Sequence, residues 1–441
     1  MLLLNEGLGR FRRVMGQVLR NWASLQRSQW LSREELTQIQ DSKLRLMLGH
    51  AFREVPFYKK LYQAKGVEPG EIRGCADIRR LPVIGRREVA SAPLQERTAL
   101  TTDLNACVPV TTSGSTGTPI TILDDFQLVA YLEALYLRFL WSCGLSPLDK
   151  TCRVRTRATR PLNEGLGLWS KLRSMRHRNL SMADNINDHI KFYLSWKPDL
   201  LASFPSYYRI LMRFCGQVGR TPAFKRVITE GELLDESTRE RINQTFNAEV
   251  FDSYGLNEVG GVAWECPTHN GYHINAESLL VEFLRDGEPV SSGEQGQVYV
   301  TSLQRMTTPI IRYATGDVAT PIDDACQCGR GLPLIKNIQG RLVDFIQTRD
   351  GRYLSPFLIT RILDQIVGVD QFKVTQKQDY SVELQVKTNG ARDEALVREL
   401  QQLCTDTLRD TALSIMIVDR IENQTGPKFR LVESQLTQRA S

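Results

Sequence analysis

Hydroxyl side chains and two glycines fill one short segment, Val110-Thr-Thr-Ser-Gly-Ser-Thr-Gly-Thr-Pro119. Glycine lets the backbone turn its N–H groups toward an anion, and hydroxyls add donors without bulk. No lysine follows the second glycine, so the segment is not a Walker A loop. A polar surface loop is the simpler interpretation, but the density of donors between a strand-like run and a long helix predicts a triphosphate-binding loop.

A second group of residues that could carry out chemistry consists of cysteines and histidines. Cys326 and Cys328 form a Cys-x-Cys pair, and Cys266 lies upstream with His269 and His273. Three thiolates and one imidazole complete a closed tetrahedral zinc site, which leaves no position for water and therefore has a structural role. The spacing is not that of a standard zinc finger, so four reduced, inert side chains are the alternative.

Three charged residues in turn-rich segments complete the candidate chemistry. Glu258 follows the turn-forming pair Tyr254-Gly255, Asp317 follows a glycine, and Lys428 follows Gly-Pro near the C-terminus. An ordinary loop carboxylate, a turn-capping aspartate and a solvated lysine are the corresponding structural interpretations.

These segments together resemble the motifs of the adenylate-forming superfamily, which includes acyl-CoA synthetases, adenylation domains and luciferases. The resemblance points to the phenylacetate–CoA ligase branch and, within it, to the CapK-like group. It covers nearly the whole chain in the order of the family: His50-Ala51, Val55-Pro-Phe-Tyr58, Leu81-Pro-Val-Ile84, Thr112–Pro119, Phe204-Pro-Ser206, Thr229-Glu-Gly-Glu232, Tyr254-Gly-Leu-Asn-Glu258, Arg312-Tyr-Ala-Thr-Gly-Asp317, Gly340-Arg341 and Gly426-Pro-Lys-Phe-Arg430.

The resemblance implies a role for each candidate residue. Lys428 would be the adenylation lysine, and Glu258 would help to bind the Mg²⁺ that bridges the phosphates. Asp317 would accept hydrogen bonds from the ribose hydroxyls, and Arg341 would contact the ribose or the phosphates near an interdomain hinge. The nucleotide-binding residues would be Thr112, Ser113, Gly114, Ser115, Thr116, Gly117, Thr118, Glu232, Tyr254, Gly255, Asn257, Asp317 and Arg341.

The chain also departs from the pattern of the family. Asn257 stands where a threonine or serine is usual, so its phosphate contact lacks the hydroxyl. Val343 stands near the hinge position where a charge is common, and Asp344 follows it. In the zinc site, the Cys-x₆-His spacing of the branch matches Cys266 and His273, with His269 as the competing choice.

The resemblance implies an α/β fold with a large multi-layer adenylate-forming N-terminal domain, residues 1–341, and a small mobile α+β lid domain, residues 342–441. The expected function is ATP-dependent conversion of a small carboxylic acid to an acyl-adenylate with release of pyrophosphate. Transfer to coenzyme A would follow, and transfer to an amine or a carrier protein is the alternative. A binding protein that contains a structural zinc ion and has lost catalysis is an alternative from a different class. The presence of Glu258, Asp317 and Lys428 together argues against it.

Composition excludes several other classes. The chain has 441 residues, of which 41% are apolar and 24% are charged, so disordered and fibrous proteins are excluded. Apolar runs are too short to span a bilayer, and no signal peptide is expected. Nine cysteines without an export signal favour the reducing cytoplasm. The basic stretch from Lys150 to Arg178 favours a solvated face, with the phosphates of coenzyme A or an acidic carrier protein as alternative partners. It lacks the interleaved aromatic residues that would favour single-stranded nucleic acid. A monomer and a homodimer both remain open.

Hydrophobic periodicity predicts the elements that would position these residues. Residues 1–100 are expected to be mostly helical, with one helix ending before Pro56. A second helix follows Asp124–Asp125 and is capped near Gly144. Strands are expected at 226–229, 250–254, 279–283 and 298–303, and in the tail a hairpin at 372–375 and 382–388, a helix at 393–409 and a strand at 413–418. Tyr207, Tyr208 and Trp264 could line an aromatic-acid pocket or belong to the core.

Overall fold

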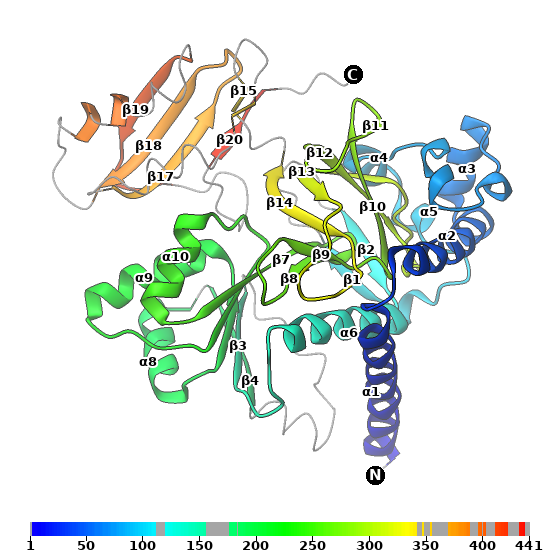
Figure 1. Ribbon diagram of the computed structural model, residues 1–441, viewed down its shortest axis with the longest axis horizontal. Helices are drawn as coiled ribbons and strands as arrows, with labels where there is room; N and C mark the ends of the chain where they lie inside the picture. The colour runs from blue at the N-terminus through cyan, green and yellow to red at the C-terminus, as the bar shows by residue number, and fades with distance from the viewer. Residues whose placement is uncertain are drawn as a thin grey trace. The chain divides into compact units, whose positions relative to one another are not determined.

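The computed structural model describes residues 2–111, 120–155, 176–182, 184–341, 346–347, 353–354, 369–388, 396–398, 400–402, 411–421 and 432–436. The chain forms two compact units (Figure 1). The first comprises Met1–Leu234 and Thr238–Ile338, and the second comprises Asp235–Ser237 and Gln339–Ser441. No helix in the described part of the chain is long and apolar enough to cross a membrane.

Helices dominate the first hundred residues, as the periodicity predicted. They are α1 (Leu2–Ser28), α2 (Arg33–Glu54), α3 (Pro56–Lys65), α4 (Arg86–Ser91) and α5 (Leu94–Arg97), with the short 3₁₀ helices η1 (Pro69–Glu71), η2 (Cys75–Arg80) and η3 (Leu104–Ala106). A capping box formed by Ser32 and Glu35 begins α2. Pro56 lacks a backbone N–H and occupies the first position of α3, so α2 ends before it.

One large mixed sheet organises the first unit. Its strand order is β11-β10-β12-β13-β14-β9-β8-β7-β6-β5-β3-β4. The strands are β3 (Thr151–Arg155), β4 (His177–Ser181), β5 (Leu200–Ser203), β6 (Arg226–Glu230), β7 (Glu249–Leu256), β8 (Gly260–Glu265), β9 (Tyr272–Ile274), β10 (Leu279–Arg285), β11 (Glu288–Pro289), β12 (Gly296–Ser302), β13 (Tyr313–Ile322) and β14 (Leu334–Arg341). The strands from β4 to β7 pair in parallel, and from β7 onward to β9 the pairing is antiparallel.

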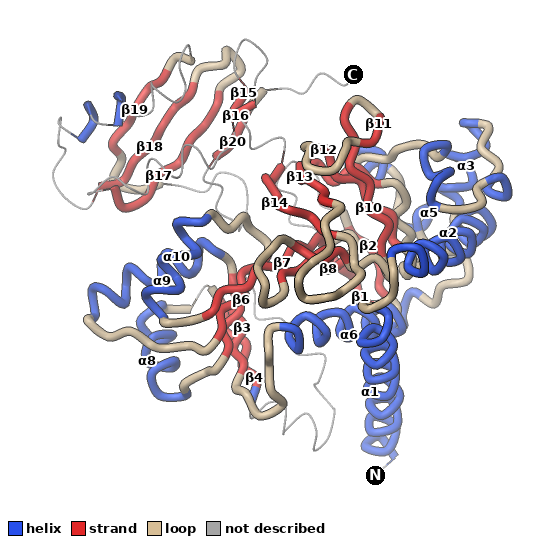
Figure 2. Tube along the Cα trace, in the orientation of Figure 1, coloured by secondary structure: helices blue, strands red, loops and turns tan. Residues whose placement is uncertain are grey.

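Helices cover both faces of the parallel half (Figures 1 and 2). On one face, α8 (Ile186–Trp196), α9 (Pro205–Val218) and α10 (Glu236–Phe246) pack against strand residues such as Val154 and Val227. On the other face, α6 (Phe126–Ser142) packs against Ala202, Ile228 and Phe251. Ribbon and tube views alike place α8, α9 and α10 on the side of the strands away from α6.

The structure decides whether Tyr207, Tyr208 and Trp264 line a substrate pocket or belong to the core. Tyr207 and Tyr208 are buried in the core under α9, and Trp264 is buried in the core under α6. The hydroxyl groups of Tyr193 and Tyr207 lie 2.6 Å apart, and the Tyr208 hydroxyl donates to the Leu201 carbonyl at 2.8 Å. These rings are therefore structural, because their polar atoms are satisfied inside the protein.

A short hairpin flanks the hydroxyl-rich segment. Strand β1 (Val108–Thr111) pairs antiparallel with β2 (Thr121–Asp124), and residues 112–119, which connect them, lie outside the described residues. The sequence did not predict β2, since only four residues separate Ile120 from the N-cap of α6. Asp125 caps α6 by accepting from Leu128 N–H at 2.8 Å, and the Thr307 hydroxyl donates to the same carboxylate at 2.8 Å. Helix α6 begins and ends where expected, and Gly144 follows it with φ 74°.

A buried ion pair joins α1, α6 and the turn before β10. Arg138 donates to both carboxylate oxygens of Glu277, at 2.6 and 3.2 Å, and to the Asn275 side-chain oxygen at 2.7 Å. The Ser28 hydroxyl donates to Glu277 at 2.7 Å. Neither charged side chain is more than 3% exposed. This network fixes α6 to α1 and to the turn before β10. Removal of one partner would leave an unpaired charge in the core, which is costly.

The second unit has its own small core. A four-stranded sheet has the order β19-β18-β17-β20, and β15 (Ile346–Gln347) pairs with β16 (Tyr353–Leu354). The four strands are β17 (Val369–Gln376), β18 (Val382–Thr388), β19 (Leu413–Ile417) and β20 (Val432–Ser434). The hairpin β17–β18 and the strand β19 confirm the expected tail, and of the expected helix at 393–409 the described residues 396–398 and 400–402 are helical.

Candidate active site

The sequence-predicted residues differ in how much the structure says of them. Thr112–Thr118 and Lys428 lie outside the described residues. Arg341 ends β14, and its side chain is likewise not described. Tyr254, Glu258 and Asp317 are described in full, and they lie on β7, in the β7–β8 turn and on β13.

Tyr254 and Asp317 are in direct contact although 63 residues separate them in sequence. The Tyr254 hydroxyl donates a hydrogen bond to Asp317 Oδ2. Asp317 follows Gly316, whose φ is 79°, and its backbone N–H donates to the Thr315 hydroxyl oxygen at 3.0 Å. Glycine at this position permits the turn of the backbone that presents the carboxylate. The aspartate is buried, at 5% exposure.

Glu258 lies in the turn between β7 and β8 and is also buried, at 5% exposure. The Tyr313 hydroxyl donates to Glu258 Oε1 at 3.3 Å, and Arg86 Nη1 approaches the same oxygen at 3.5 Å. Tyr313 begins β13, the strand that carries Asp317. Tyr254 and Asp317 therefore make direct contact, and Glu258 is held beside β13 by the Tyr313 phenol and the Arg86 guanidinium.

Arg86 is a site residue that sequence reasoning missed. It begins α4, directly after the segment that runs beside β13, where Ile84 N–H donates to Arg312 O at 3.1 Å and Ala314 N–H donates to Ile84 O at 2.8 Å. The signal available was the motif around Leu81–Ile84, which lies two residues upstream of Arg86. The identity of the cation beside Glu258 could not be read among 56 lysines and arginines.

Glu232 acts as a helix cap. Its Oε2 accepts from the Ser206 backbone N–H at 2.9 Å, and its Oε1 accepts from the Ser206 hydroxyl at 2.9 Å. Ser206 lies in the first turn of α9, where backbone N–H groups lack helical partners and a negative charge is favourable. The carboxylate therefore joins the loop after β6 to the first turn of α9.

Gly255 and Asn257 are exposed. A Cβ on Gly255 would approach Gly260 O at 3.2 Å, so the bulge in the β7–β8 hairpin favours glycine there. Asn257 is the first residue of the turn that also holds Glu258.

Cys266, His273, Cys326 and Cys328 are brought together by β8, β9 and the loop after β13, and their ligand atoms all lie within 4.8 Å of one another. The sulfurs of Cys266 and Cys326 are 3.6 Å apart, and Cys328 Sγ is 3.3 Å from His273 Nε2. Tetrahedral zinc with bonds of about 2.3 Å to sulfur and 2.0 Å to nitrogen places such pairs roughly 3.8 and 3.5 Å apart. The donor set fits zinc, and the distances are close to the required ones.

The electrostatics of this cluster follow from burial. Burial lowers the pKa of His273 to about 4, so the imidazole is neutral, the form that binds a metal. Burial raises the pKa of the Cys266 thiol to about 11. Burial acts in the same direction on Cys328, but hydrogen bonds from the backbone and side chain of Arg330 bring its pKa below the usual value.

His269 lies outside the cluster. Its two ring nitrogens lie 3.5 Å from Glu249 Oε1 and 3.5 Å from Glu265 Oε2, and its ring is 5.0 Å from that of Phe251. A hydrogen bond to Glu265 raises the pKa of His269. Of the two candidate histidines, the structure thus groups His273 with the cysteines and pairs His269 with carboxylates.

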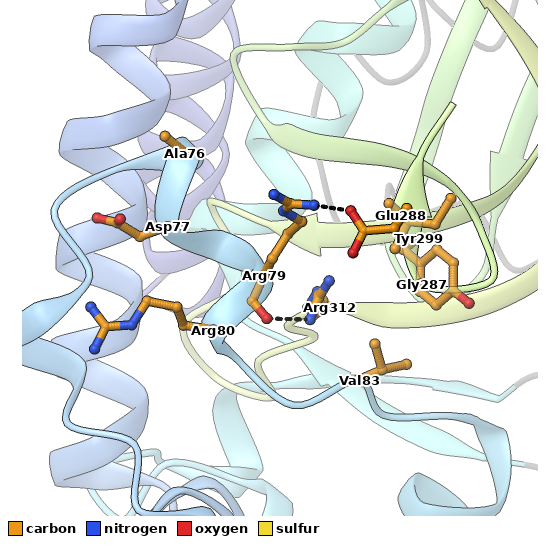
Figure 3. Close-up of a pocket in the computed structure, with 10 residues that line it drawn as sticks. Ala76, Asp77, Arg79, Arg80, Val83, Gly287, Glu288, Tyr299 and Arg312 are labelled. Atoms are coloured by element: carbon orange, nitrogen blue, oxygen red, sulfur yellow. Dashed lines mark hydrogen bonds and ion pairs between the residues drawn. The ribbon is translucent and has the colours of Figure 1, made fainter. Parts of the chain in front are cut away.

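A surface pocket of about 510 Å³ lies elsewhere, between η2 and the β10–β12 strands. Figure 3 shows Arg79 turned toward Glu288, while the Arg312 guanidinium donates to the Arg79 carbonyl at 3.0 Å. Arg312 also pairs with Glu282 at 3.3 Å. Because Arg79 pairs with Glu288 at the surface and Arg312 pairs with Glu282, neither guanidinium is left without a carboxylate partner, and we assign the pocket no role.

Comparison with known proteins identifies relatives along most of the chain. The phenylacetate–coenzyme A ligase of Thermus thermophilus is 25% identical over 331 residues, which cover 72% of this chain and 73% of that protein. Protein CapK of Staphylococcus aureus is 20% identical over 428 residues and covers 90% of this chain and 88% of its own. No protein-family model matches the chain.

Solved structures show the same fold. The crystal structure of 2-hydroxyisobutyryl-CoA ligase in the postadenylation state, in complex with R3-HIB-AMP, superposes with a TM-score of 0.78 at 18% identity. The match covers 93% of this chain and 92% of that one. The α/β architecture expected from the sequence is therefore confirmed as that of the adenylate-forming enzymes.

Proposed function

Because the chain is related to the phenylacetate–coenzyme A ligases and has the adenylate-forming fold, we propose that it is an AMP-forming ligase. It uses ATP to convert a carboxylic acid to an acyl-adenylate, releases pyrophosphate, and passes the acyl group to coenzyme A. The observation that supports this best is the contact of Tyr254 with Asp317, from β7 and β13, together with the buried Glu258, which the Tyr313 hydroxyl at the start of β13 contacts.

Each of these side chains has a task that its chemistry suits. Asp317 binds the ribose hydroxyls with its carboxylate, whose position Tyr254 fixes. Glu258 fits the Mg²⁺ that accompanies ATP, since carboxylate oxygen is the ligand this ion prefers, and the bound ion neutralises phosphate charge. Arg86 lies 3.5 Å from Glu258 and orients that carboxylate before nucleotide binds. Gly255 and Asn257 complete the nucleotide-facing loop through backbone and side-chain amides, and Glu232 supports the neighbouring loop through its bonds to Ser206.

The remaining catalytic groups belong to segments predicted from the sequence. Thr112–Thr118 bind the phosphates, and Lys428 places its ammonium near the α-phosphate and the attacking carboxylate. Residues 342–441 act as a lid that follows Arg341, and its motion separates adenylation from thioester formation. Coenzyme A is the proposed acceptor, and an amine or a carrier protein is the alternative.

We further propose that Cys266, His273, Cys326 and Cys328 hold a structural zinc ion. The support is their donor set, their mutual distances and the neutral state of His273. Four protein ligands leave no open coordination position, so the ion would have no part in the reaction. Thr268, whose hydroxyl lies 3.1 and 3.2 Å from two of the sulfurs, would help to orient the thiolates.

Acid-dependent exchange of pyrophosphate into ATP, measured across a panel of aryl and aliphatic acids, tests the adenylation step. We expect Lys428→Ala to bind ATP but to lose exchange by at least about 100-fold. Lys387→Ala, on β18 of the same unit, is the matched control and keeps the parent rate. Exchange at the parent rate in Lys428→Ala would contradict the assignment of that lysine.

Addition of acceptors to preformed acyl-adenylate then separates the two acyl-transfer hypotheses. Coenzyme A should discharge the adenylate and form a thioester, with AMP as the second product. Discharge by an amine or a carrier protein, with no effect of coenzyme A, would replace the proposed acceptor and leave the adenylation step intact.

A further inference from the structure

A guanidinium–carboxylate pair lies at the carboxyl end of the parallel strands. Arg153 on β3 donates to Glu230 on β6 through Nε at 2.8 Å and through Nη2 at 2.5 Å, in a bidentate arrangement. The Arg153 guanidinium also lies over the ring of Tyr136, 4.6 Å from its centroid. Arg153 and Glu230 are only 19% and 17% exposed. This pair is therefore rigid and internally satisfied.

A second guanidinium follows Arg153 on the same strand. Arg155 is two residues further along β3, so its side chain projects from the face that Arg153 occupies. Burial lowers the pKa of Arg155, and the charge of Arg153 lowers it further. Glu230 is engaged by Arg153, and Glu133 on α6 acts on Arg155 only through its charge. Within the described parts of the chain, nothing accepts a hydrogen bond from the Arg155 side chain.

The location of Arg155 connects it to the substrate. In open α/β sheets, ligands bind outside the carboxyl ends of the parallel strands. Arg155 ends β3, and Glu230 ends β6 immediately before Gly231 and Glu232, which belong to the proposed nucleotide loops. Arg155 therefore lies at the carboxyl end of the parallel strands, where the acid and the nucleotide must meet.

We propose that Arg155 binds a second anionic group of the acid substrate, so that the enzyme activates dicarboxylic acids or acids of similar charge. The inference rests on the proposed ligase function and specifies its substrate class. A planar guanidinium matches a carboxylate through two parallel hydrogen bonds, and Arg153 keeps Glu230 from competing for it. A cation without a bonded partner in a half-buried position is poorly stabilised until such a group arrives.

The test compares acids that differ only in the second charge: succinate with butyrate, glutarate with pentanoate, and phthalate with benzoate. In pyrophosphate exchange, the parent protein should favour the doubly charged member of at least one pair. Arg155→Gln should lower kcat/KM for that acid by about 10- to 100-fold and leave its singly charged partner within about twofold. The matched control is Arg178→Gln, an arginine of the adjacent strand β4 that lies over Trp196.

Two further measurements separate the possible failures. In the absence of ATP, the affinity for the preferred diacid, measured by calorimetry, should be lower in Arg155→Gln than in the parent protein. Equal affinity in the two proteins would overturn the inference. A structural role of Arg155 predicts a lower Tm in Arg155→Gln, whereas a binding role predicts an unchanged or higher Tm. Equal loss with every acid would assign Arg155 to the reacting carboxylate and overturn the proposal. Absence of exchange with all acids would refute the ligase function itself.

Discussion

The buried pair of Arg138 and Glu277 gives the sharpest stability prediction. Arg138 is fully buried, and it donates to Glu277 twice and to Asn275 once. Its guanidinium also lies 5.7 Å from the ring of Trp264. Arg138→Met removes these contacts and leaves the Glu277 carboxylate in the core with only the Ser28 hydroxyl as a partner among the side chains described above.

The expected magnitude follows from that unpaired charge. Removal of one member of a buried ion pair costs about 3–5 kcal/mol, because the other member stays desolvated. For a unit of about 335 residues, an unfolding entropy of about 2.1 cal/mol/K per residue converts this loss to a Tm lower by roughly 4–7 °C. The double variant Arg138→Met with Glu277→Gln removes both charges, and its loss should be about 2 kcal/mol or less.

The pH dependence provides an independent check. Burial alone would raise the pKa of Glu277, but the charge of Arg138 and its hydrogen bonds lower that pKa below the usual value. A carboxyl group with a lowered pKa stabilises the fold above its unfolded pKa of about 4.3, and this stabilisation is lost as pH falls through the folded pKa. The Tm advantage of the parent protein over the double variant should therefore shrink below about pH 4.

Thermal and urea unfolding of the parent, both single variants and the double variant form one mutant cycle. If Arg138→Met is as stable as the double variant at pH 7, the Glu277 carboxylate costs nothing when it has lost its partner, and the reasoning from buried charge is wrong.

Two predictions concern the candidate sites. Tyr254→Phe removes the hydroxyl that donates to Asp317, and we expect kcat/KM for ATP to fall about 10-fold in the exchange assay with little change in Tm; an unchanged value would mean that this hydrogen bond does not position the aspartate. Cys326→Ser should abolish the copurified zinc and lower the Tm, whereas Cys107→Ser, outside the cluster, should retain about one equivalent; less than half an equivalent in the parent protein would count against the metal site.

Much of the fold could be predicted because local signals agreed with the tertiary structure. The apolar stripe of α6, its aspartate cap and Gly144 fixed that helix at both ends. Pro56 separated α2 from α3, since proline cannot continue a helix. Strand β2 was missed, because its few residues carry no periodicity that distinguishes them from the approach to α6.

The candidate site was accessible from the sequence only where a motif marked it. Glycine and turn residues mark the positions of Glu258 and Asp317 in the sequence. In the structure Asp317 is part of β13, and Glu258 contacts Tyr313 at the start of that strand. Arg86 and Arg155 could not be found, because their significance arises from strand pairing and from burial, which bring together residues that are distant in sequence. Nor does sequence reveal that the Glu232 carboxylate is used to cap α9.

The cysteine cluster has a topological consequence. Cys266 and Cys326 are 60 residues apart in sequence, and their sulfurs are 3.6 Å apart. An ion that joins them turns β9 to β13, the stretch that contains Asp317, into a closed ring. Closing a loop of that length in the unfolded chain is worth roughly 4 kcal/mol by the polymer estimate used for cross-links. The supply of zinc would then govern what fraction of molecules holds the Asp317 carboxylate, the proposed ribose ligand, in place.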